Sequence, residues 1–230
     1  KNSLLKLLPF QPDYIFASET YGTQLAEVIN SQFIPVDPER SLHPVAATQI
    51  RNNLSQNFDF LIPPAQSFFR QRICICGPES TGKSTLTKWL AEEFKSCYVP
   101  EYARTYLDNI NRDLQSQDFI NIAKGQVINE EIISQQANVL FFIDTGARVS
   151  AIWSEWLLGQ CDELLANFCQ QQNYDLYLLC KPDVPWVNDR VRYLPDSSDE
   201  FFNQIKATLP SDKMVVIEGD WQQRYATAKN

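Results

Sequence analysis

Short apolar runs alternate with longer amphipathic stretches along most of this chain. The longer stretches carry their apolar residues at helical spacing, as the segment from Ser116 to Gln136 does. Beyond residue 70 the apolar runs read, in order, RICIC, CYVP, VLFFID, YDLYLLC and MVVIEG. Short apolar strands that alternate with helices of about ten or more residues predict βαβ units, and therefore an α/β fold whose parallel sheet has helices on both faces.

The part of the chain before residue 63 has a similar but shorter pattern. YIFAS (Tyr14 to Ser18) and FIPV predict strands, and TYGTQLAEVI between them predicts a helix. Two prolines and several polar residues in PPAQSFFRQR then separate the two apolar patterns. We therefore expect two domains, residues 1–66 and residues 67–230, of which the first is about half the usual size of a domain.

Composition narrows the classes of partner. The net charge of -8 and the pI near 4.7 argue against a nucleic-acid-binding surface, which needs clustered Lys and Arg. No apolar run approaches the ~20 residues of a membrane span. The six cysteines have no zinc-binding spacing, so we interpret them as reduced thiols of a cytoplasmic protein. Cys74 and Cys76 are expected to face the same side of a strand as small buried side chains.

The segment GPESTGKS, Gly77 to Ser84, fits the phosphate-loop pattern GxxxxGK[ST] between a predicted strand and a predicted helix. Glycines let the loop N–H groups approach phosphate oxygens, and the N-terminus of the next helix adds positive charge. Lys83 would neutralise phosphate oxygens and the Ser84 hydroxyl would bind Mg²⁺. The residues expected to contact the nucleotide are Gly77, Glu79, Ser80, Thr81, Gly82, Lys83, Ser84 and Thr85.

Two further strand ends carry candidate groups. Asp144 follows the apolar run VLFFI, so it is a candidate for Mg²⁺ binding or for a base, although a lone Asp there also caps a turn or a helix. Glu101, Tyr102 and Arg104 follow the run CYVP, where a carboxylate, an aromatic ring and a guanidinium could recognise a ribose, a base ring and a phosphate. The alternative is an ordinary helix N-terminus with surface charges.

Several motifs in a fixed order carry a family resemblance: GPESTGKST, PEYARTYL, FIDT, AIWSEWLLG, YDLYLLCKPDVPWVNDRVRYLPD and EGDWQQRY. Over residues 71–228 the chain resembles the ribosylnicotinamide kinase half of the NadR-type bifunctional nicotinamide-nucleotide adenylyltransferase/ribosylnicotinamide kinase family. Upstream, FASETYG and VDPERSLHPVAATQIR are similar to the carboxyl-terminal part of that family's Rossmann-like adenylyltransferase domain. The resemblance therefore implies a P-loop kinase domain preceded by a partial nucleotidyltransferase domain.

The resemblance also implies a reaction, in which ATP phosphorylates the 5'-hydroxyl of nicotinamide riboside to give nicotinamide mononucleotide in NAD salvage. It places Lys83 and Ser84 on ATP and Mg²⁺, and Asp144 near the metal and the attacking hydroxyl. It places Glu101 and Tyr102 in the riboside pocket. From the lid motif, Arg192 would cover the phosphates, Asp189 belongs to the same pattern, and Trp186 could enclose the cationic nicotinamide ring or simply pack in the lid.

The chain departs from the family pattern at named positions. Where the family reads DTD, this chain reads DTG, with Gly146 in place of the second acid, and Arg190 replaces a lid glycine. The adenylyltransferase stretch GxFxPxHxGH does not occur in the sequence, so adenylyltransferase activity is not expected from this chain. A partial αβ domain exposes apolar surface unless it docks on the kinase part or on a partner chain, and a homo-oligomer is one such arrangement.

Three functions remain open at this level. The first is a nicotinamide riboside kinase. The second is a non-catalytic module that binds ATP and a pyridine nucleotide, and only this reading predicts a large gain in rate from an aspartate at position 146. The third is a P-loop kinase for another small nucleoside. Trp153, Trp156 and Leu157 are interpreted as core packing, and Trp221, after the last strand, as a residue that stacks on adenine.

Overall fold

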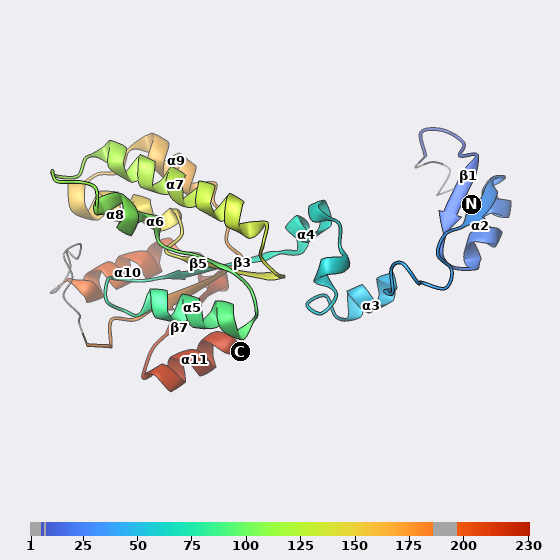
Figure 1. Cartoon of the computed structure of the whole chain (residues 1–230). Coiled ribbons are helices and arrows are strands. Elements are labelled where there is room, and N and C mark those ends of the chain that lie inside the picture. Colours follow the sequence, from blue (N-terminus) through green and yellow to red (C-terminus); the bar gives the residue numbers. More distant parts are fainter. Residues whose placement is uncertain (1–5, 7, 186–196) are drawn as a thin grey trace. The chain divides into compact units, whose positions relative to one another are not determined.

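The chain forms two compact units, Lys1–Ile62 and Pro63–Asn230 (Figure 1). The computed structural model describes residue 6, residues 8–185 and residues 197–230. The second unit begins with helix α4 (Pro63–Phe69), whose first two residues are prolines. Proline suits the first turn of a helix because its missing N–H would have no partner there. The structural division therefore falls after Ile62, slightly before the boundary at residues 66 and 67 that the sequence predicted.

The first unit is built around a small parallel βαβ arrangement. Strands β1 (Tyr14–Ala17) and β2 (Gln32–Pro35) pair in parallel, and helix α2 (Tyr21–Ile29) connects them. These elements confirm the two strands and the helix that the periodicity predicted. Helix α3 (Ala47–Asn52) and the 3₁₀ turn η1 (Phe58–Phe60) follow.

The second unit contains a parallel sheet of five strands in the order β4-β5-β3-β6-β7. The strands are β3 (Gln71–Cys76), β4 (Tyr98–Val99), β5 (Leu140–Asp144), β6 (Leu176–Cys180) and β7 (Met214–Ile217). Each corresponds to one of the five apolar runs of the sequence. Because the strands are parallel, all of their carboxyl ends lie at one edge, where the phosphate loop and Asp144 meet.

Helices cover both faces of this sheet, as predicted (Figure 1). Helix α5 (Lys83–Glu93) and helix α11 (Trp221–Lys229) pack with one buried cluster, and helices α8 (Arg148–Leu158) and α10 (Ser198–Thr208) with the other. Helices α6 (Tyr102–Leu107), α7 (Ser116–Ser134) and α9 (Glu163–Gln170) lie on the α8 side, and the 3₁₀ turn η2 (Ser211–Lys213) precedes β7.

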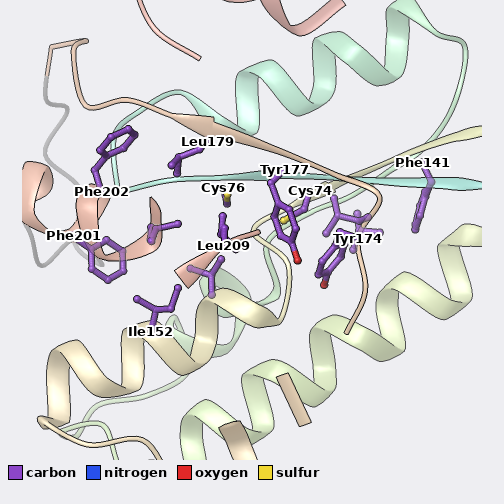
Figure 2. Packing of buried hydrophobic residues seen from close by; sticks show 14 of the residues in the cluster. Cys74, Cys76, Phe141, Ile152, Tyr174, Tyr177, Leu179, Phe201, Phe202 and Leu209 are labelled. Atoms are coloured by element: carbon purple, nitrogen blue, oxygen red, sulfur yellow. The ribbon is translucent and has the colours of Figure 1, made fainter. Parts of the chain in front are cut away.

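Strand alternation explains the two clusters. Cys74 and Cys76 point to one face, where Figure 2 shows Cys76 near Leu179 and Cys74 near Tyr177; the α10 residues Phe201 and Phe202 belong to the same cluster. The intervening β3 residues point to the other face and pack on α5. Cys74 and Cys76 are fully buried, which confirms the prediction for this pair, and all six cysteines are free thiols. None of the helices formed by residues 6, 8–185 and 197–230 has the length and apolar character of a membrane span.

Candidate active site

The phosphate loop connects β3 to α5 and depends on glycine at two positions. Gly77 has φ 142°, and a Cβ there would lie only 2.5 Å from the Cys180 carbonyl oxygen. Gly82 has φ 81°, in the left-handed region, and is the N-cap of α5. Ser80 also adopts a positive φ, of 62°. The loop therefore folds back tightly over the end of the sheet, a backbone shape that can present N–H groups to an anion.

Lys83 and Ser84 are the first two residues of α5. The Lys83 Nζ donates to the Pro78 carbonyl oxygen at 2.8 Å, and the Thr81 hydroxyl donates to the same oxygen at 2.8 Å. The lysine side chain thus turns back over its own loop. Loop, cation and helix N-terminus converge, which is the arrangement that a phosphate group requires.

Asp144 ends β5 beside this loop and is 3% exposed. Burial, and after it the negative charge of Glu101, raises the pKa of its carboxyl to about 6. The positive charge of Lys83 and hydrogen bonds from the hydroxyls of Ser84 and Thr145 act in the opposite direction. A buried carboxylate that accepts from the Ser84 hydroxyl next to a lysine is a donor set that Mg²⁺ with a bound phosphate could use.

A cavity of about 500 Å³ opens at the carboxyl ends of β3, β4 and β5. Most of the predicted site residues line it: Glu79, Ser80, Thr81, Gly82, Lys83, Ser84, Thr85, Glu101, Arg104 and Asp144. The wall also includes apolar residues that the sequence did not single out for binding, namely Leu107, Leu114, Phe119, Ile122, Trp153 and Leu157. The cavity therefore joins a polar region at the phosphate loop to an apolar and aromatic region.

Trp153 has two roles in this wall. Its ring lies 4.2 Å from that of Phe201, centroid to centroid, which confirms the predicted packing role. The same side chain, with Ser150 and Leu157, also lines the cavity. These three residues lie three and four positions apart on α8, so one helix face serves both the core and the cavity. Helical spacing in the sequence could have shown the shared face, but not that a cavity adjoins it.

Tyr102 lies apart from its sequence neighbours in the site. A Cβ at Gly125 of α7 would lie 2.2 Å from Tyr102 Cε1, so the ring packs directly on that glycine. Tyr102 lines a second, open hollow of about 420 Å³ with residues of α6 and the loop after it. Glu101 and Arg104 line the main cavity, whereas the structure does not bring the Tyr102 ring to its lining. The predicted contact of Tyr102 with substrate therefore stays a prediction.

The phosphate loop is held from behind by Arg224. This guanidinium is 1% exposed and donates to the carbonyl oxygens of Thr81 at 3.1 Å, Lys181 at 2.9 Å and Gly219 at 2.8 Å. It also pairs with the Asp183 carboxylate. A single buried cation therefore ties the loop to the ends of β6 and β7, a connection that sequence reasoning missed because the partners are far apart in the chain.

Trp221 packs on the phosphate loop. A Cβ at Gly82 would lie 2.5 Å from Trp221 Cη2. The predicted adenine-stacking role of Trp221 stays a prediction. The predicted lid residues lie outside the described residues. They are Trp186, Asp189 and Arg192, together with Arg190, which replaces the lid glycine.

Helix α7 carries a stripe of three buried polar residues that sequence reasoning also missed: Asp118, Gln126 and Glu130. Asp118 accepts from Arg112 and from the Tyr106 hydroxyl. Gln126 accepts from the backbone N–H of Tyr102, and Glu130 accepts from Arg72 and from the Tyr174 hydroxyl. Their spacing of eight and four residues places them on one helix face, which is the only signal that the sequence contains.

The chain is similar to known proteins in sequence and in fold. A family model described as an AAA domain matches residues 72–224. The trifunctional NAD biosynthesis/regulator protein NadR of Escherichia coli (strain K12) is 29% identical over 225 residues, which cover 94% of this chain and 55% of NadR. The NadR of Salmonella typhimurium (strain LT2) has the same identity and coverage. The chain thus spans about half the length of these curated relatives.

Two solved structures share the fold. A NadR protein in complex with NR matches with a TM-score of 0.71 and 24% identity, over 99% of this chain and 71% of that chain. A NadR protein in complex with NAD and AMP-PNP matches with a TM-score of 0.68 and 22% identity, over 99% of this chain and 68% of that chain. At these identities the likeness concerns the fold. With the family match over residues 72–224, it follows that the chain belongs to the AAA domain family and is homologous to the NadR proteins.

Proposed function

We propose that this protein is an ATP-dependent kinase that phosphorylates nicotinamide riboside to nicotinamide mononucleotide, a step of NAD salvage. One observation carries the proposal: a single cavity brings the phosphate loop, Lys83, Asp144 and Glu101 together and continues into an apolar, aromatic wall. A phosphate donor fits the first region and a nucleoside the second. The homologous NadR structures bind NR in one case and AMP-PNP in the other, which supports both ligands.

The residues at the loop fit Mg²⁺ bound together with ATP. Among the described residues there is no group of three or more His, Cys, Asp or Glu side chains placed to hold a metal. Mg²⁺ with a nucleotide does not need one, because it commonly takes one or two carboxylates, with phosphate oxygens and waters completing its shell. Asp144 and Ser84 would hold it, and when bound it would supply positive charge to the phosphate oxygens.

The side chains of this protein would mainly position the reactants and neutralise negative charge on the phosphate groups. Lys83, at the start of α5, would offset negative charge on the transferred phosphoryl group. Asp144 would orient the attacking hydroxyl or accept its proton, and its raised pKa makes it a stronger proton acceptor than an ordinary carboxylate. Glu101 faces the same cavity and would bind ribose hydroxyls. Trp153 contributes an aromatic face to the wall that would enclose the nicotinamide ring.

The test is formation of nicotinamide mononucleotide coupled to ADP release, with nicotinamide riboside, ATP and Mg²⁺. Wild type should turn over at ordinary kinase rates, Lys83→Ala should lose this activity, and Lys124→Ala, an exposed lysine on α7, should keep it. Equal activity in wild type and Lys83→Ala would show a contaminating kinase. Calorimetric ATP binding without turnover would favour the non-catalytic module, and preference for a competing nucleoside would favour another nucleoside kinase.

A further inference from the structure

We propose that Gln126 is a positioning residue that holds Glu101 at the cavity through the first backbone N–H of α6. The inference rests on the proposed function, since it assumes that Glu101 contacts the riboside. Gln126 lies on α7, and Glu101 is the residue that immediately precedes α6.

The contact between the two helices is direct. The Gln126 Oε1 accepts the backbone N–H of Tyr102 at 2.9 Å. Tyr102 is the first residue of α6 and follows Glu101, the N-cap. The Glu101 side chain makes no capping hydrogen bond to its own helix, so its carboxylate is not committed there. Gln126 therefore accepts the N-terminal N–H that a capping side chain would otherwise accept. The Glu101 carboxylate faces the cavity instead.

A second contact beside the first fixes the same turn. The Tyr102 ring packs on Gly125, where a Cβ would lie 2.2 Å from Tyr102 Cε1. Two adjacent α7 residues thus bind the backbone and the ring of the residue after Glu101. Because α6 is only six residues long, its first turn depends on these two contacts with α7. The direction of the Glu101 side chain therefore depends on α7 as well.

The other end of the Gln126 side chain shows that packing alone does not explain this residue. Gln126 is 2% exposed and itself lines the main cavity, and its Nε2 has no hydrogen-bond partner among the described residues. Glu130, one turn further along α7, already accepts hydrogen bonds from Arg72 and from the Tyr174 hydroxyl. An unsatisfied buried donor destabilises the folded protein, a penalty that an apolar side chain of the same size would avoid. The acceptor oxygen is the part of Gln126 that makes a strong contact.

The test is a double-mutant cycle between positions 126 and 101. Gln126→Met keeps the side-chain size and removes the acceptor, and it should lower kcat/KM for nicotinamide riboside about 10- to 100-fold while KM for ATP stays unchanged. Glu101→Gln should cause a loss of its own. The double variant should be no worse than the weaker single variant, because Gln126 acts through Glu101. Gln117→Met, on the exposed face of the same helix, is the matched control and should match wild type.

Several outcomes would overturn the inference. They are unchanged kinetics in Gln126→Met, losses that multiply in the double variant, or an equal rise in KM for ATP, which would indicate a general structural effect. If Gln126→Met fails to fold, Gln126→Asn, whose amide is one methylene too short to reach Tyr102, takes its place in the cycle.

Failure of the proposed function is visible separately, as absent turnover in wild type. In that case hydrogen exchange at the Tyr102 amide decides whether the contact exists. Faster exchange in Gln126→Met, but not in Gln117→Met, would support the holding role, and unchanged exchange would reject it.

Discussion

The ring of Tyr174 fills the space beside Gly146. A Cβ at Gly146 would lie 2.5 Å from both Cζ and the hydroxyl oxygen of Tyr174, and 3.0 Å from Cys74 Sγ. The Tyr174 hydroxyl is itself fixed, because it accepts the N–H of Ala147 at 3.0 Å and donates to Glu130 at 3.0 Å. A side chain at position 146 would therefore point into the core, and Gly146 does not line the main cavity. The acid that the family resemblance places here has no room in this chain.

Gly146→Asp is accordingly expected to destabilise the protein without raising its rate. The side chain would clash with Tyr174 and would bury a carboxylate without a partner, so a loss of at least about 1–3 kcal/mol is expected in thermal or urea unfolding. Gly146→Ala separates the two causes, because it keeps the clash and omits the charge. A Gly146→Asp variant that is as stable as wild type and clearly faster would contradict this expectation and would favour the non-catalytic module.

Asp144→Asn is expected to lower the kinase activity and to raise the stability of the folded protein. Burial raises the pKa of Asp144 to about 6, so the ionised carboxylate destabilises the folded protein at pH 8 in the absence of metal. Removing the charge should raise the free energy of unfolding by about 1–3 kcal/mol in EDTA. The same variant should lose most kinase activity and most of the stabilisation that Mg²⁺ and ATP give to wild type. A variant destabilised in EDTA would show that Asp144 is held by compensating contacts instead.

Asp118 should contribute to stability against acid. The hydrogen bond from Arg112 holds the pKa of Asp118 at about 2, below its ordinary value of 3.8. The contribution is therefore fully present above about pH 4 and is lost as the pH falls toward 2. Asp118→Asn should lower stability at pH 7 by on the order of 1–2 kcal/mol, and its deficit should shrink below pH 4, because wild type loses the same contact there. Asp113→Asn, an exposed acid next to Arg112 in the loop before α7, should show neither effect in pH-dependent unfolding.

Arg224→Lys should loosen the phosphate loop. Lysine keeps the positive charge but cannot reach the carbonyl oxygens of Thr81, Lys181 and Gly219 at once, as the guanidinium does. We expect a stability loss of about 2–3 kcal/mol and a higher KM for ATP, with KM for the riboside less affected. Lys229→Met breaks only an exposed pair with Glu93 and should change stability by less than about 1 kcal/mol. If Arg224→Lys left the ATP affinity unchanged, the guanidinium would be a core contact without influence on the loop.

Local sequence patterns were sufficient for the sheet and for the polar half of the site. An apolar run alternates its faces wherever it lies in the fold, so the five strands, both helix layers and the buried pair Cys74 and Cys76 could be predicted. The phosphate loop is one continuous segment with glycines at the positions of unusual φ, so Lys83 and Ser84 could be located as well. Asp144 required only that parallel strands end at one edge of the sheet.

Contacts between distant segments could not be predicted in this way. Gln126 and Tyr102 form a hydrogen bond although they are 24 residues apart in the sequence, and Arg224 and Thr81 do so at a separation of 143 residues. No local sequence pattern predicts contacts at such separations. The tertiary structure decided that the Tyr102 ring packs on Gly125, that Trp153 serves core and cavity together, and that Tyr174 excludes a side chain at Gly146. The sequence by itself determined which elements form and which segment has the conformation of a phosphate loop, because propensity, periodicity and loop conformation are local properties. Only the tertiary structure decided which side chains line the cavity together, because that depends on how helices and strands far apart in the sequence pack against one another.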